Sequence, residues 1–286
     1  MRLLKTAFLL TVLTMLLIYG GQALAGRQGM TIGLVMAFVM NIGAYFFSDK
    51  IALMSSGAQP VTREQAPRLY ASVERLAARG NLPVPKVYII PQAAPNAFAT
   101  GRNPRHAAVA ATEGLLQLMN DDELDGVIAH ELGHVRNYDI LTSSIAATLA
   151  GAITWIAHMA QWAMIFGGGR RDNDRGGGGG IAALAMIILA PIAAMVMQLA
   201  ISRQREYAAD ASSARLLGHP YGLISALEKL GAYNKRIPME VSPATSQLFI
   251  VAPLSAGQVF SSLFSTHPPL EKRIAALRQM DIPHSH

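Results

Sequence analysis

The sequence predicts a mainly α-helical integral membrane protein that also carries a polar α+β domain with a small β-sheet. Of the 286 residues, 51% are hydrophobic and only 15% are charged, and the mean hydropathy is +0.30. A soluble domain usually has about 25% charged residues. The apolar residues are clustered in four runs, each close to the roughly 20 residues that a helix needs to cross a bilayer. Low charge and this clustering together predict four transmembrane helices.

The first two apolar runs predict a transmembrane hairpin over 1–48, with helices over roughly 3–20 and 30–47. The basic start of the chain and the small residues "ALAG" at 23–26 also fit a cleaved signal peptide. However, the first run is longer than the apolar part of most signal peptides, and a second run follows almost at once. We therefore prefer an uncleaved hairpin.

The other two runs predict a second hairpin over 141–201, with helices over roughly 141–166 and 181–201. The third run contains polar residues such as His158, so its prediction as a full span is weaker than the other three. The glycine-rich loop 167–180 is typical of a flexible turn.

The distribution of basic residues predicts the orientation of the chain. Lys and Arg in short loops favour the cytoplasmic side, and the chain begins with Arg2 and Lys5. With four spans, both polar segments, 49–140 and 202–286, then face the cytoplasm, and the arginines of loop 167–180 oppose this only weakly. We expect a multi-pass membrane protein whose polar segments face the cytoplasm.

The two polar segments predict helices around a small sheet. Thr62 and Gly80 can cap and end an amphipathic helix over 62–79. The other predicted elements are strands at 86–90, 96–101 and 106–112, and helices at 112–119, 120–135, 202–217 and 267–280. Neither segment has enough apolar residues to close a core alone, so we expect one domain that the second hairpin interrupts.

One predicted helix carries the pattern H-E-x-x-H, at His130, Glu131 and His134. Residues four apart lie on one face of a helix, so both imidazoles can reach one metal ion. Glu131 then lies beside a bound water, whose pKa zinc lowers to about 7. The alternative is two solvated histidines, but the motif lies among apolar residues, where unpaired polar groups are costly. We expect Gly133 to allow close packing.

A catalytic zinc needs three protein ligands and one open position. Glu206 and Asp210 lie four residues apart on a second predicted helix, "SRQREYAAD". One carboxylate can bind the metal while the other holds a histidine N–H. The alternative is a solvated acidic face.

The motifs "NAFATG", "AHELGHVRNYD", "SRQREYAAD" and "STHPPLEKR", with the four apolar runs in this order, make the chain resemble the HtpX-type bacterial membrane zinc metalloproteases, relatives of the CAAX prenyl proteases. The resemblance implies a gluzincin-type α+β protease domain, one Zn2+ per subunit and a location in the bacterial inner membrane, with the active site facing the cytoplasm. It implies His130, His134 and Glu206 as ligands, Glu131 as general base and Asp210 as the partner of a ligand histidine.

The resemblance also implies residues that contact substrate. The residues Asn96, Ala97, Phe98 and Ala99 would line a groove in which a peptide adds to the sheet edge; the alternative is a plain turn after Pro95. His267 would stabilise the oxyanion and Arg273 would lie near the substrate. The alternative is a helix-capping histidine with an arginine salt bridge.

We therefore expect a zinc metalloendopeptidase that cleaves cytosolic parts of misfolded or damaged membrane proteins, in quality control and stress response. Expected partners are membrane-protein and unfolded substrates, the lipid bilayer and the protein itself through self-cleavage, but no nucleic acid. One alternative is a prenyl-protein endopeptidase, although four runs are few for its membrane chamber. Another is a non-enzymatic zinc-binding membrane scaffold. The lack of cysteine excludes disulfides, thiolate ligands and a cysteine nucleophile.

Overall fold

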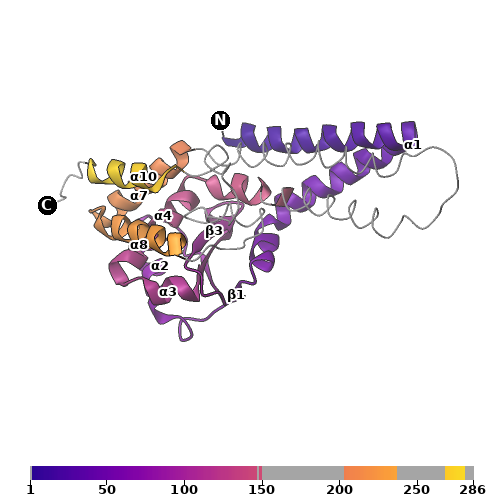
Figure 1. Cartoon of the computed structure of the whole chain (residues 1–286). Coiled ribbons are helices and arrows are strands. Elements are labelled where there is room, and N and C mark those ends of the chain that lie inside the picture. Colours follow the sequence, from indigo (N-terminus) through magenta and orange to yellow (C-terminus); the bar gives the residue numbers. More distant parts are fainter. Residues whose placement is uncertain (1, 147, 150–202, 237–267, 281–286) are drawn as a thin grey trace.

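The computed structural model describes residues 2–146, 148–149, 203–236 and 268–280. In these residues a long helical hairpin projects from an α/β unit that contains the remaining helices and a sheet (Figure 1). Most of the second predicted hairpin, 141–201, lies outside the described residues, as does His267.

The hairpin is formed by α1 (Arg2–Ser55), which turns back on itself at Gly26. Gly26 has φ +57°, in the left-handed region that a residue without a Cβ adopts freely. Beyond this turn the two arms run side by side (Figure 1). The Asn41 side-chain amide donates to Thr14 Oγ1 across the arms at 2.8 Å. The first 55 residues therefore form an antiparallel pair of helical arms.

Within the described residues, one helix is long and apolar enough to cross a membrane, Gly26–Ser55, with a mean hydropathy of 1.8. Only 17% of its apolar window is buried against the rest of the protein. Its large exposed side chains include Phe38 and Val39, and such a surface is suited to lipid. Thr6–Tyr19 is a shorter apolar helix. The other three expected spans stay predictions.

The four strands form one mixed sheet in the order β1 (Gln59–Pro60), β2 (Lys86–Ile90), β4 (Ala107–Thr112), β3 (Ala97–Gly101). β2 and β4 are parallel, and the other two pairs are antiparallel. The expected small sheet before the motif is confirmed. It gains only the two-residue β1, which sequence patterns did not indicate. β3 lies at one edge.

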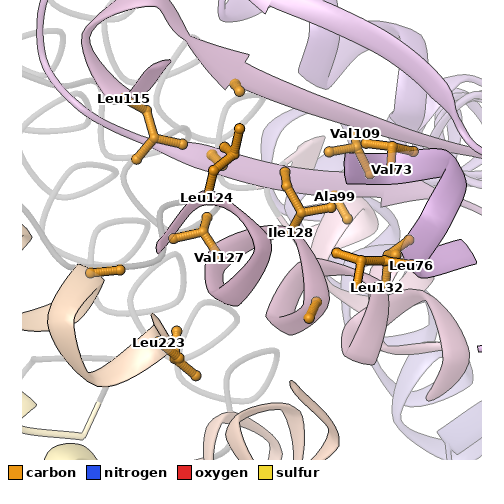
Figure 2. Packing of buried hydrophobic residues seen from close by; sticks show 14 of the residues in the cluster. Val73, Leu76, Ala99, Val109, Leu115, Leu124, Val127, Ile128, Leu132 and Leu223 are labelled. Carbon is orange, nitrogen blue, oxygen red and sulfur yellow. The ribbon is translucent and has the colours of Figure 1, made fainter. Parts of the chain in front are cut away.

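The two faces of the sheet pack against different helices. Because side chains alternate along a strand, Ala99 and Val109 face α2 (Pro67–Arg79) and α4 (Asp121–Arg136) in the main core (Figure 2). On the opposite face Phe98 packs with Ala52 and Leu53 in the last turns of α1. The sheet is therefore held between the motif helix and the end of the apolar hairpin.

From the second polar segment, α7 (Arg203–Leu217) and α8 (Tyr221–Arg236) pack against the other side of α4, and α10 (Leu270–Arg278) packs on α7 and α8. Leu223 of α8 and Leu277 of α10 belong to the same core as Leu124 and Val127 of α4, and Figure 2 shows Leu223 across from Val127. Residues of both polar segments therefore share one hydrophobic core.

Most predicted helix positions are confirmed, with two differences. The helix expected over 62–79 begins only at Pro67, with Ala66 as its N-cap, so the expected cap at Thr62 is wrong. Proline is well placed in the first turn because it has no N–H to leave unpaired. The second difference is α8, which was not predicted from the sequence. Its signal was Pro220 followed by Leu223, Leu227 and Leu230 at helical spacing.

Candidate metal centre

The motif helix α4 is fixed at its start by a capping box. The Asn120 side chain accepts from the Glu123 backbone N–H, and the Glu123 side chain accepts from the Asn120 N–H. Two turns further on, His130 and His134 lie on one face, with their Nε2 atoms 3.2 Å apart. The imidazoles therefore point to one place, as the spacing predicts.

Glu206 of α7 completes the cluster. Its Oε2 lies 3.7 Å from His130 Nε2 and its Oε1 lies 3.6 Å from His134 Nε2. One ligand atom from each of the three residues lies within 4.8 Å of the others. Two ligands at 2.0–2.1 Å from a tetrahedral zinc are about 3.4 Å apart, so these separations fit one such ion. The set of two nitrogens and one carboxylate also suits zinc.

Gly133 lets α7 come close to the motif. A Cβ at this position would lie 3.2 Å from both Ala209 Cα and Ser212 Cβ of α7. That separation is tighter than ordinary van der Waals contact, so a side chain here would push the two helices apart. The expected close packing at Gly133 is present, and it brings Glu206 within reach of the histidines.

Asp210, one turn after Glu206, holds the first histidine from behind. Its Oδ1 lies 2.9 Å from His130 Nδ1, which leaves Nε2 directed at the cluster. Arg273 of α10 in turn holds Asp210 with two bonds, from Nη2 to Oδ1 at 2.6 Å and from Nε to Oδ2 at 2.9 Å. The Arg273 guanidinium is completely buried. Side chains of α4, α7 and α10 thus meet on the Nδ1 side of His130, away from the three candidate ligand atoms.

Arg273 forms a salt bridge, as the alternative to a substrate contact in the sequence analysis had it. Its Nη1 lies 3.6 Å from Glu206 Oε2, so its charge faces two carboxylates of the cluster. A role in substrate binding stays a prediction, and so does the role of His267, outside the described residues. Sequence patterns gave no signal for the pairing of Arg273 with Asp210.

A second carboxylate, missed in the sequence analysis, lies behind the other histidine. Asp139 Oδ2 is 3.5 Å from His134 Nδ1, and Asp139 Oδ1 is 3.3 Å from Arg205 Nε. Asp139 is almost fully buried. Each of the two motif histidines therefore has a carboxylate at its Nδ1 and an arginine behind that carboxylate.

Glu131 lies between the metal cluster and the edge strand. It is buried, and its Oε2 accepts a 2.8 Å hydrogen bond from the Ala99 backbone N–H of β3. Asn96, just before β3, is fixed through its own N–H, which donates to Thr112 Oγ1 at 2.8 Å. Every residue of β3 is buried. Of the predicted groove residues, the structure thus places Ala99 directly against the predicted base.

The electrostatics of the cluster favour a cation. Burial raises the pKa of Glu131 to about 7; the Glu206 carboxylate adds to this rise and His134 opposes it. Burial alone would lower the pKa of His134, but the carboxylates of Asp139, Glu206 and Glu131 raise it to about 9. Protons are thus retained at both groups, as in a region of negative potential.

For the pair His130 and Asp210 the pKa values are lowered instead. Burial, helped by Arg273 and His134, lowers the pKa of His130 despite its bond to Asp210. Burial would raise the pKa of Asp210, but Arg273 and His130 hold it below its usual value. His130 is therefore neutral and Asp210 ionised, the states in which an imidazole Nε2 can bind a metal.

Comparison with known proteins gives independent evidence of the family to which the chain is related. Residues 63–281 match the model of peptidase family M48. The chain is 57% identical over 274 residues to a "Protease HtpX homolog" of Desulforapulum autotrophicum, covering 96% of this chain and 88% of that protein. It is 54% identical over 283 residues to a "Protease HtpX homolog" of Syntrophotalea carbinolica, covering 99% and 100%.

A solved structure, that of S. mikatae Ste24p, is also similar. Its TM-score is 0.53 at 22% sequence identity, over 92% of this chain. The chain spans only 61% of the length of that structure. At this identity the likeness concerns the fold alone.

Proposed function

The chain belongs to peptidase family M48 and is a metallopeptidase, and on this basis we propose that it is a membrane-bound zinc endopeptidase that cleaves cytosolic parts of misfolded or damaged membrane proteins. The expected HtpX-type family and enzyme class are confirmed. One observation carries the proposal: His130, His134 and Glu206 gather within 4.8 Å, beside the buried Glu131.

We assign the three clustered side chains as zinc ligands and Glu131 as general base. His130, His134 and Glu206 would hold the zinc ion, which when bound would supply polarisation of the scissile carbonyl and a water whose pKa is lowered to about 7. The buried carboxylate of Glu131 follows the ligand His130 directly in the motif, where it can act as the base on such a water. The Ala99 N–H keeps one carboxylate oxygen in place, so the other can take the proton and pass it to the leaving amine.

The substrate peptide is proposed to add to the outer edge of β3. β3 pairs with β4 on one side only, and the Ala99 N–H points away from β4 toward Glu131. Backbone groups on that edge can hold an extended peptide beside the base. Asn96 to Ala99 then line the groove.

A substitution at Asn96 tests this groove. We expect Asn96→Ala to lower kcat/KM by roughly 5–150-fold, mainly through KM, because a lost buried hydrogen bond is worth about 1–3 kcal/mol. Zinc affinity should not change. Asn103→Ala, at the tip of the same hairpin, is the matched control. A fall in kcat alone, or an equal effect of both substitutions, would contradict the groove assignment.

The hairpin and its packing support the proposed membrane location. Gly26–Ser55 is the candidate span, and its last turns pack directly on the sheet through Ala52 and Leu53. We therefore propose that the protease domain, 49–140 and 202–286, lies at the end of this span. We place it on the cytoplasmic side of the bacterial inner membrane, where it can reach loops of membrane proteins and of other copies of itself.

The substrate class is tested by comparing the cleavage of two substrates in separate assays. The purified protein in detergent would receive an unfolded membrane protein or a prenylated peptide, each with zinc present. We expect cleavage within polar loops of the membrane protein and none of the peptide. Cleavage of the prenylated peptide alone would replace the quality-control role with that of a prenyl-protein endopeptidase.

A further inference from the structure

Asp139 stands in the same relation to His134 as Asp210 does to His130. Asp210 Oδ1 is 2.9 Å from His130 Nδ1, and Asp139 Oδ2 is 3.5 Å from His134 Nδ1. Both carboxylates are buried. They come from different elements: Asp210 from α7, and Asp139 from the chain directly after the motif helix.

The backbone is shaped to bring Asp139 back to the motif. In a continuous helix, a residue five positions after His134 would point about 140° away from it. Instead, α4 ends at Arg136, and Tyr138 has φ +57°. Side chains other than glycine rarely adopt that conformation. A new helical segment starts at Asp139, and its carboxylate faces His134 Nδ1.

Arg205 holds Asp139 from the other side. Its Nε lies 3.3 Å from Asp139 Oδ1, while Oδ2 is left to His134. Arg205 directly precedes the ligand Glu206 on α7. The carboxylate is thus fixed between the helix that supplies two ligands and the helix that supplies the third.

We propose that Asp139 is a positioning residue for the metal ligand His134. Its carboxylate accepts a hydrogen bond from the Nδ1–H of His134, which fixes the tautomer and directs Nε2 at the metal. A cation bound at Nε2 makes the Nδ1–H a stronger hydrogen-bond donor. Hydrogen bonds that are long in a free enzyme often shorten in its complexes, so we expect the 3.5 Å separation between His134 Nδ1 and Asp139 Oδ2 to shorten when metal binds. The proposal rests on the metal site proposed above.

The test is zinc affinity, measured by competition with a chelating dye on the full chain in detergent. The Glu131→Gln background prevents self-digestion, and wild type is titrated beside it. Loss of such a partner typically weakens metal binding about 10–100-fold, and we expect this from Asp139→Asn. Asp139→Glu, which keeps the carboxylate, should bind at least several-fold more tightly than Asp139→Asn.

Asp125→Asn is the matched control, because it removes a carboxylate of α4 that pairs with Arg75 far from the metal. It should leave zinc affinity unchanged. Metal-free Asp139→Asn should still unfold cooperatively, at a lower Tm than wild type because Asp139 is buried beside Arg205. Wild-type affinity in Asp139→Asn, equal losses in Asp139→Asn and Asp139→Glu, or failure of Asp139→Asn to fold would overturn the proposal. If wild type itself binds no zinc, the proposed function fails instead.

Discussion

Replacing Glu131 by glutamine should abolish peptide cleavage while zinc stays bound. General-base catalysis contributes about 10²–10⁴-fold, so we expect kcat to fall by at least that range. Glutamine keeps the size of the side chain and can still accept from the Ala99 N–H, but it cannot take a proton from water. Glu131→Ala should have the same effect. The measurements are steady-state cleavage of an unfolded substrate and zinc content after gel filtration.

The contrast with the ligands makes this prediction specific. His130→Ala and His134→Ala should lose cleavage and zinc together, because each removes a nitrogen of the cluster. Full activity in Glu131→Gln would remove Glu131 from the mechanism. Loss of zinc in Glu131→Gln would show instead that Glu131 serves the metal rather than the reaction.

Replacing Arg273 by glutamine should strongly destabilise the protease domain. The guanidinium is completely buried between Asp210 and Glu206, so its removal leaves buried carboxylates without their counter-charge. Breaking a buried pair in this way costs about 3–5 kcal/mol. At about 2–4 °C per kcal/mol for a domain of this size, Tm should fall by roughly 6–20 °C. The measurement is thermal unfolding of the metal-free protein in detergent.

Arg278 on the same helix is the matched control. It pairs with Glu228 at 2.8 Å, but both side chains are largely exposed, and such surface pairs contribute little. Arg278→Gln should therefore leave Tm nearly unchanged. Equal stability of the Arg273 and Arg278 variants would mean that the buried pair does not hold α10 against α7.

Short sequence patterns correctly predicted those features of the fold that depend only on neighbouring residues. The run "KVYII", which follows two prolines, predicted β2 at its observed bounds, Lys86–Ile90. The spacing of His130 and His134 predicted that their side chains meet, since a helix places residues four apart together. Gly80 ends α2 as expected. In each case the signal lies within a few residues of the feature.

The missing parts of the site depend on contacts that no local pattern encodes. Arg273 and Asp210 are 63 residues apart, and only the packing of α10 on α7 brings them together. Asp139 faces His134 because the helix is interrupted at Tyr138, which has φ +57°. A tyrosine in the sequence does not predict such an interruption. The sequence suggested that an acidic side chain would hold a histidine. It did not indicate that both histidines have one.

The central claim is tested most directly by removing the metal and returning it. The protein would be purified in detergent with a chelator, which also prevents self-digestion, and then given zinc together with an unfolded membrane-protein substrate. We predict that wild type cleaves only after zinc is added and that Glu131→Ala binds the zinc without cleaving. Zinc-independent cleavage, or zinc binding with no cleavage of any substrate by wild type, would contradict the assignment of His130, His134 and Glu206 as a catalytic zinc site.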